Sequence, residues 1–128
     1  MPISSSLLNK PRLVEKLKKF YQYVQKNDGQ VGTKTRGIDL NFNNACNLRC
    51  KYCFTNSPKG DHVKDYLDIG AIRKLADEAD ELGYFEFDLQ GGELLLQPKK
   101  LFEVLEAIKP ERFYMYLTTN GYYLDEAM

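Results

Sequence analysis

The chain has 128 residues, of which 43% are hydrophobic and 28% charged, and its 18 basic residues balance 18 acidic ones. This composition is typical of a globular domain and excludes an intrinsically disordered chain. No apolar run is long enough to cross a membrane, and the N-terminus lacks the basic and apolar segments of a secretory signal, so the sequence predicts a cytoplasmic protein.

The charges are distributed unevenly along the chain. Residues 1–37 contain eight lysines and arginines against two acidic residues, so this segment carries +6 and the remainder carries −6. A basic segment of this kind binds an acidic partner or nucleic acid, or it docks on an acidic part of its own chain. We favour docking on the chain itself, and we expect neither a nucleic-acid nor a membrane partner.

The first predicted element is an amphipathic helix over residues 7–27. Apolar residues recur there at helical spacing: Leu13, Leu17, Phe20 and Val24. Pro11 suits the first turn of a helix, and Asp28-Gly29 is typical of a helix end. A loop with three glycines follows, from Gly29 to Gly37.

The rest of the chain alternates predicted strands with predicted helices. The strands are residues 38–43, 84–89 and 113–118, and the helices are residues 69–82 and 98–108, with a third helix opening at Leu124. Asp68 is the expected N-cap of the helix over 69–82, and Gly83 its stop. This order indicates an α/β fold with parallel strands, whose C-terminal ends carry the chemistry.

Each helix has an expected inward face. For the helix over 69–82 that face is Ile69, Ile72, Leu75, Ala76, Ala79 and Leu82, and for the helix over 98–108 it is Leu101, Phe102, Leu105 and Ile108.

The predicted strands alternate apolar and polar residues, although parallel strands covered on both faces are usually apolar throughout. The polar positions are Asp39, Asn41, Asn43, Tyr84, Glu86, Asp88, Tyr114, Tyr116 and Thr118. We expect the apolar faces to pack on the helices and the polar faces to line a hydrated or ligand-filled interior. Mutual pairing of the polar residues, or exposure of an incomplete sheet, is the alternative.

Three cysteines lie within eight residues directly after the first predicted strand: Cys46, Cys50 and Cys53. An odd number of closely spaced thiols indicates metal binding rather than a disulfide framework, and thiolates suit zinc or an iron–sulfur cluster. His62 is the only histidine, and a zinc site that uses it as the fourth ligand is the main alternative.

Three motifs together resemble the radical S-adenosylmethionine (radical SAM) superfamily over residues 38–124. They are Cys-x3-Cys-x2-Cys with Tyr52 before the last cysteine, Gly91-Gly92-Glu93 after the second strand, and Thr119-Asn120-Gly121 after the third. The resemblance implies a partial, TIM-like barrel of β/α units. It divides the chain into an N-terminal basic helix and linker, residues 1–37, and the first half of the barrel, residues 38–128.

The resemblance also implies the cofactors. The three cysteines would hold three irons of a [4Fe–4S] cluster, and S-adenosyl-L-methionine would bind the fourth. An electron donor such as flavodoxin or ferredoxin would reduce the cluster. Cleavage of S-adenosylmethionine would then give a 5′-deoxyadenosyl radical that abstracts hydrogen from a substrate, in an oxidoreductase or transferase reaction.

Roles for the remaining motif residues follow from the same resemblance. Gly91 and Gly92 would let the backbone approach the methionyl group, and Glu93 would accept a hydrogen bond from its ammonium. Tyr52 would pack near the cluster and the adenine. Asn120 would hydrogen-bond cofactor or substrate, or serve only in a turn.

The chain departs from the family in its length. Complete members have six β/α units, whereas three strands are predicted here, so we expect an N-terminal fragment, a truncated product or half of an assembly. The missing half of the barrel or a partner chain would then complete it. We favour a peptide substrate; the alternatives are a sugar or nucleoside substrate, or a non-catalytic iron–sulfur or zinc module.

Overall fold

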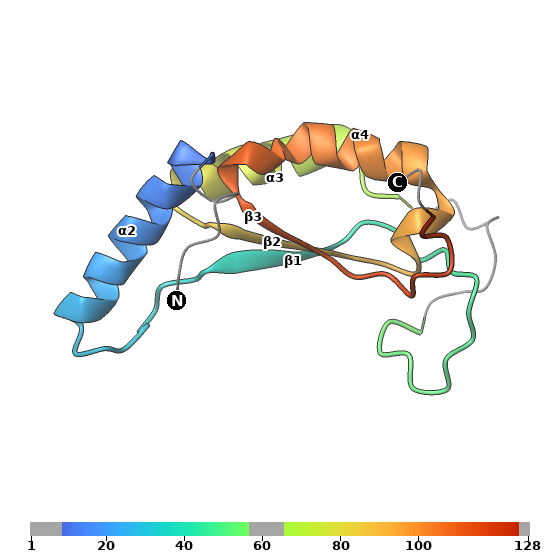
Figure 1. The fold of residues 1–128 in the computed structure, drawn as a ribbon, viewed down its shortest axis with the longest axis horizontal. Coiled ribbons are helices and arrows are strands. Elements are labelled where there is room, and N and C mark those ends of the chain that lie inside the picture. Colours follow the sequence, from blue (N-terminus) through green and yellow to red (C-terminus); the bar gives the residue numbers. More distant parts are fainter. Residues whose placement is uncertain (1–8, 57–65, 126–128) are drawn as a thin grey trace.

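The computed structural model describes residues 9–56 and 66–125 of the chain (Figure 1). In chain order its helices and strands are α2 (Pro11–Lys26), β1 (Gly37–Asn41), α3 (Ile69–Glu81), β2 (Glu86–Gln90), the 3₁₀ helix η1 (Leu94–Leu96), α4 (Pro98–Ile108), the 3₁₀ helix η2 (Pro110–Arg112) and β3 (Tyr114–Leu117).

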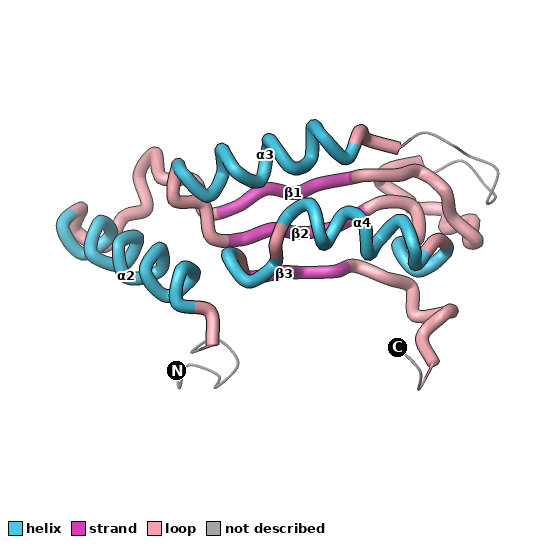
Figure 2. The backbone as a smooth tube through the Cα atoms, turned by 90° about the horizontal axis from the view of Figure 1, so that it is seen from above, coloured by secondary structure: helices cyan, strands magenta, loops and turns pink. Residues whose placement is uncertain are grey.

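The three strands form one parallel sheet in the order β1-β2-β3. Both α3 and α4 lie side by side on the same face of this sheet (Figure 2). The sequence prediction of an α/β fold built from parallel β/α units is confirmed, and the observed part is an open sheet with one covered face.

The strands are shorter than predicted, and their ends differ from the predicted ends by one or two residues. Pairing in β1 ends at Asn41, after which Asn43 forms an isolated antiparallel bridge with Tyr66. The start of β2 is delayed because the amides of Phe85 and Glu86 both donate to the carbonyl of Arg36, where the two strands first meet.

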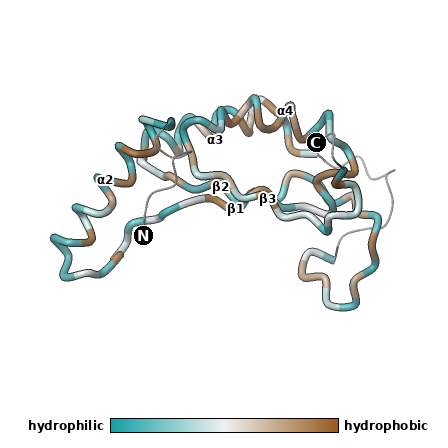
Figure 3. The backbone as a smooth tube through the Cα atoms, in the orientation of Figure 1, coloured by the Kyte–Doolittle hydropathy of each residue, from teal (hydrophilic) through white to brown (hydrophobic). Residues whose placement is uncertain are grey.

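The core lies between the sheet and the two covering helices. Hydrophobic and hydrophilic residues alternate along these helices and strands (Figure 3). Phe42, Phe87 and Phe113 are its largest buried side chains, and the Phe87 and Phe113 rings meet edge to face at 4.7 Å. The prediction that the apolar strand faces pack on the helices is confirmed. On β3, Leu117 stays exposed because it lies at the end of an edge strand.

Two residues predicted to face inward are exposed, so these predictions are wrong. Phe102 is 60% exposed, because Val104 and Ala107 rather than Phe102 complete the buried stripe of α4. Leu82 is 66% exposed because it follows the last turn of α3 as the C-cap, beyond the helix surface that meets the sheet.

The signals that predicted helix ends are confirmed at Pro11, Asp68 and Gly83, although α2 begins at Pro11 and not at residue 7. Pro11 occupies the first turn of α2, and the Asp68 carboxylate accepts a hydrogen bond from the Ala71 amide at 2.8 Å, as an N-cap does. Gly83 follows α3 with a φ of +82°, a conformation that favours glycine. Leu124 and Asp125 are the last described residues, so the continuation of the helix expected from Leu124 lies outside the described part, as does His62.

Helix α2 docks on the body through a buried ionic contact at the start of α2 and the end of α3. The Lys16 side chain is only 2% exposed, and its Nζ lies 2.8 Å from Asp80 Oδ1 and 3.9 Å from the centre of the Phe113 ring. Arg12 Nε lies 3.1 Å from the same carboxylate oxygen. The basic segment thus binds an acidic residue of its own chain.

The two partners of this ion pair respond differently to burial. Burial lowers the pKa of Lys16, although the hydrogen bond to Asp80 opposes this shift. Burial by itself would raise the pKa of Asp80, but hydrogen bonds from Lys16 and Arg12 outweigh it and hold that pKa below its usual value. Asp80 is therefore the charged anchor of α2.

No helix in the described ranges combines the length and the apolar character that a membrane span requires.

Replacement of Asp80 will destabilise the chain more than replacement of its lysine partner. In Asp80→Asn the Lys16 ammonium stays buried without a carboxylate, and we expect a loss of about 3–5 kcal/mol in the free energy of unfolding. In Lys16→Met the apolar stem is retained and Asp80 keeps Arg12, so we expect a loss below about 1.5 kcal/mol. Urea denaturation of both variants measures the difference.

The same pair predicts a pH dependence. Because the pKa of Asp80 is lower in the folded chain, its stabilising contribution is present above the unfolded pKa and is lost as the pH falls through the folded value. Stability should thus decline below about pH 4, and less steeply in Asp80→Asn. Equal acid sensitivity of wild type and Asp80→Asn would contradict this role.

Candidate functional site

The three segments that carry the sequence motifs meet at one edge of the sheet. Because the strands are parallel, their C-terminal ends lie together, and residues 43–53, 91–93 and 119–121 follow them directly. The cysteine-bearing loop extends from this edge toward the side opposite α3 and α4 (Figure 1). The loop and the polar face of the sheet are therefore on the same side.

The Gly91-Gly92 turn packs closely on the segment that leads into the first cysteine. The Gly92 amide donates to the Asn43 carbonyl at 3.1 Å, and the Glu93 amide donates to the Ala45 carbonyl at 2.7 Å. A Cβ on Gly92 would lie 1.9 Å from the Ala45 oxygen, a distance that no real contact tolerates. A glycine at position 92 is thus required by the approach of the cysteine loop, a requirement that the sequence did not reveal.

The Glu93 side chain is buried, with 1% of its surface exposed, and it accepts three hydrogen bonds. Oε1 accepts from the Leu95 amide at 2.9 Å and from Thr119 Oγ1 at 2.6 Å, and Oε2 accepts from the Asn120 amide at 2.8 Å. The second and third motifs are therefore joined directly by this carboxylate.

Asn120 connects the end of β3 to the cysteine loop. Its Nδ2 donates to Asn47 Oδ1 at 2.9 Å, and Asn47 directly follows Cys46. Its Oδ1 accepts from the Tyr122 amide at 2.9 Å, and Gly121 has a φ of +78°, so Asn120 also forms a local turn. Asn120 therefore takes part in a turn and also contacts the cysteine loop.

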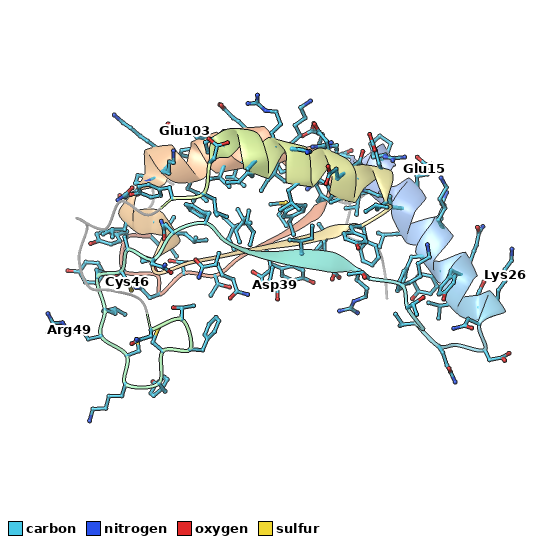
Figure 4. The ribbon with its side chains drawn as sticks, turned by 180° about the vertical axis from the view of Figure 1, so that it is seen from behind. Glu15, Lys26, Asp39, Cys46, Arg49 and Glu103 are labelled. Atoms are coloured by element: carbon cyan, nitrogen blue, oxygen red, sulfur yellow. The ribbon has the colours of Figure 1, made fainter. Side chains whose placement is uncertain are left out.

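The three cysteines lie on an open loop, with Cys46 at its root beside the sheet (Figure 4). Cys46 is half-buried, Cys50 and Cys53 are exposed, and none of them forms a disulfide. Within the described ranges, three or more potential ligands among cysteine, histidine, aspartate and glutamate nowhere gather closely enough to hold a metal ion. Tyr52, expected near the cluster, is 92% exposed on this loop.

The metal-binding and hydrogen-bonding groups near this edge are nevertheless of the chemical types that the implied cofactors need. Three thiols on one loop form the soft ligand set of an iron–sulfur cluster. Asn43 is buried, its Oδ1 accepts from the Gly92 amide at 3.3 Å, and its Nδ2 has no partner among the described residues. A buried donor of this kind is costly unless a ligand or water accepts its hydrogen bond.

The polar face of the sheet forms a hollow of about 360 Å³ beside the strands. A row of polar side chains crosses it, because Asp39 pairs in register with Asp88 and Asp88 with Tyr116. Glu86 adds a third carboxylate, and Arg36 lies 3.7 Å from it. Burial, then the Glu86 charge, raises the pKa of Tyr116. The prediction that polar residues share this face is confirmed for these positions.

Comparison with known proteins decides the family. A sequence profile of the radical SAM superfamily matches residues 40–128, which is more than half of the chain and includes all three motifs. The chain belongs to the radical SAM superfamily. The resemblance that the cysteines and the two strand-end motifs predicted is thereby confirmed.

Three radical SAM relatives illustrate the range of similar proteins. A "Probable GTP 3′,8-cyclase" of Methanocaldococcus jannaschii is 33% identical over 97 residues, which are 75% of this chain and 32% of the relative. A 5-amino-6-(D-ribitylamino)uracil–L-tyrosine 4-hydroxyphenyl transferase of the same organism is 31% identical over 104 residues, 77% of this chain and 29% of the relative. A cysteine-type anaerobic sulfatase-maturating enzyme of Clostridium perfringens is 30% identical over 95 residues, 64% of this chain and 25% of the relative.

The chain spans about a third or less of the length of these relatives. They share its radical SAM region and are enzymes by name, with different substrates. The comparison fixes the superfamily, and it leaves the activity and the substrate to be proposed from the site.

The close contact at Gly92 predicts that a single methyl group added at this position will strongly destabilise the folded chain. In Gly92→Ala the new Cβ meets backbone of Ala45, so we expect a loss of about 3 kcal/mol or more in the free energy of unfolding. In the matched variant Gly91→Ala the nearest atoms are Asn43 Oδ1 at 2.8 Å and the Asn43 backbone oxygen at 2.9 Å, both farther than the 1.9 Å contact at position 92, so the loss should be smaller. Urea denaturation of both proteins measures the ranking, and equal losses would contradict it.

Proposed function

We propose that this chain is the cofactor-binding part of a radical SAM enzyme, in which Cys46, Cys50 and Cys53 bind a [4Fe–4S] cluster and S-adenosylmethionine binds beside it. The observation that carries the proposal is the meeting of the three family motifs at one sheet edge, joined by hydrogen bonds through Glu93 and Asn120. When bound, this pair of cofactors supplies a 5′-deoxyadenosyl radical, which abstracts hydrogen from the substrate.

The chain's own residues orient these groups and exclude water. The space that a Cβ would take at Gly91 and Gly92 is filled by Asn43 and Ala45, and the remaining backbone of this turn is proposed to contact the methionyl group. The buried Asn43 amide offers that group a donor. One lone pair of Glu93 Oε2 is proposed to accept from the methionine ammonium, because among the described residues only the Asn120 amide donates to that oxygen. Tyr52 and Asn120 are proposed to close over the cofactor from the loop and from the end of β3.

The exposed loop also suits an electron donor such as a flavodoxin or ferredoxin. Cys50 and Cys53 lie at the surface, and Cys50 stands in the sequence between two exposed basic residues, Arg49 and Lys51. The Arg49 side chain points away from the sheet (Figure 4). Positive charge beside the cluster ligands would steer an acidic electron carrier to this loop.

Reconstitution under anaerobic conditions tests the cofactor proposal. With iron and sulfide the chain should bind about four irons and show the absorbance of a [4Fe–4S] cluster, and Cys46→Ala, Cys50→Ala and Cys53→Ala should each lose it. After reduction, S-adenosylmethionine should yield 5′-deoxyadenosine. The product is detected by liquid chromatography and mass spectrometry.

His62→Ala serves as the matched control for the competing zinc site. Under the proposal this variant keeps its iron, since His62 is not a ligand. Tightly bound zinc in the wild type, lost in His62→Ala, with no cluster formed, would refute the enzyme and support a zinc module.

We propose a peptide rather than a nucleotide as the substrate. Among the described residues that line the hollow, Asp39, Glu86 and Asp88 provide three carboxylates against the single guanidinium of Arg36. Like charges on neighbouring strands destabilise a sheet, so the Asp39–Asp88 pair favours a function for the charge. A nucleoside triphosphate would be repelled, whereas a neutral or basic peptide would be attracted. Among the relatives, the sulfatase-maturating enzyme has a protein as its target by name.

Binding measurements distinguish the two substrate classes. A lysine-containing peptide should bind the reconstituted chain more tightly than GTP, and Asp39→Asn/Asp88→Asn should weaken peptide binding about tenfold as two attractive charges are lost. Calorimetric titration with each probe gives the dissociation constants. Tighter binding of GTP than of the peptide would favour a nucleotide substrate and contradict this proposal.

A further inference from the structure

The carboxylate of Glu93 occupies an unusual place for a charged group. It is almost completely buried, and its three donors are neutral: the Leu95 amide, the Thr119 hydroxyl and the Asn120 amide. A buried carboxylate is costly unless such donors are held in place around it. The Glu93 carboxylate therefore fixes the position of Thr119 and Asn120, which follow β3.

The residue fixed in this way also holds the cysteine loop. The Asn120 backbone is bound by Glu93, and its side chain donates to Asn47 at 2.9 Å. On the other side, the Glu93 backbone amide donates to the Ala45 carbonyl at 2.7 Å. Cys46 lies between Ala45 and Asn47, so both of its chain neighbours are tied to Glu93, one directly and one through Asn120.

We propose that Glu93 is a positioning residue that locks the root of the cysteine loop, so that Cys46 is held at the sheet edge before any cofactor binds. This deepens the proposed function, because it names what organises the cluster ligands. The role is independent of any contact between Glu93 and S-adenosylmethionine, since every hydrogen bond that produces it lies within the protein.

The rival explanation is local. Through Leu95, Glu93 also caps the 3₁₀ helix η1, and a residue that acted only as this cap would not influence the cysteine loop. The two explanations differ at Cys46, which is half-buried, whereas Cys50 on the same loop is exposed and serves as an internal reference.

The test measures thiol alkylation in the metal-free full chain under reducing, anaerobic conditions. Iodoacetamide labelling followed by peptide mass spectrometry gives the ratio of the Cys46 rate to the Cys50 rate. In Glu93→Gln the carboxylate charge is lost and one oxygen becomes an NH2 group that cannot accept from a backbone N–H, so the hydrogen bonds to Thr119 and Asn120 weaken and this ratio should rise about five- to tenfold. Asn47→Ala, which removes the other end of the connection, should raise it similarly.

Matched variants distinguish loss of the hydrogen bonds that join Glu93, Asn120 and Asn47 from a nonspecific loss of stability. Thr119→Val loses the hydroxyl donor and should raise the ratio, whereas Thr119→Ser keeps the donor and should restore the wild-type value. Glu103→Gln removes an exposed carboxylate of α4 and should leave the ratio unchanged. The double variant Glu93→Gln/Asn47→Ala should rise little above either single variant, because both break the same chain of contacts.

An unchanged Cys46 ratio in folded Glu93→Gln, or additive effects in the double variant, would overturn the proposal. Should Glu93→Gln fail to fold by circular dichroism, Thr119→Val and Asn47→Ala carry the test alone, and a wild-type ratio in both would overturn it equally. The proposed function fails separately: a wild type that binds no cluster, while these ratios change as expected, would leave the positioning role intact.

Discussion

The contact between the Gly92 backbone and the Ala45 carbonyl is the constraint on which the candidate site depends. It brings the turn after β2 against the chain after β1, so closely that no side chain fits between them. Glu93 is thereby placed at the centre of the sheet edge, from which its carboxylate reaches the end of β3. Three segments that are distant in sequence become one hydrogen-bonded unit around the root of the cysteine loop.

This unit explains why two motifs with no metal ligand accompany the cysteines. The glycines allow contact between backbones, the glutamate provides the central acceptor, and Asn120 transmits the connection to the loop. The loop itself is exposed beyond Cys46, and its sulfur atoms are not gathered within the described part of the chain. Order at the root and openness at the tip suit a loop whose final shape is set by the cluster it is proposed to bind.

Much of the fold followed from local patterns in the sequence. Alternation along the strands and helical spacing of apolar residues gave the β/α order, and the N-cap at Asp68 and the stop at Gly83 were correct because these signals act within one turn of a helix. The inward placement of Phe102 is wrong because spacing alone does not tell which of the adjacent residues Leu101 and Phe102 meets the sheet, and that of Leu82 is wrong because Leu82 lies beyond the last turn of α3. The buried Lys16–Asp80 pair joins residues 64 apart, and no local pattern identifies such a partner. For the same reason the motif residues could be grouped by family resemblance, but their mutual hydrogen bonds could not be foreseen.

The ionic docking of α2 has a consequence for how the chain can be divided. Helix α2 lies at the end of the sheet opposite the cysteine loop (Figure 1), and it covers Phe113 and Asp80 there. Expression of residues 38–128 alone would uncover an aromatic ring of the core and leave a carboxylate without its buried lysine. A shortened core of this kind would keep every cofactor motif and yet aggregate, since the sequence boundary at residue 37 cuts through a packed interface.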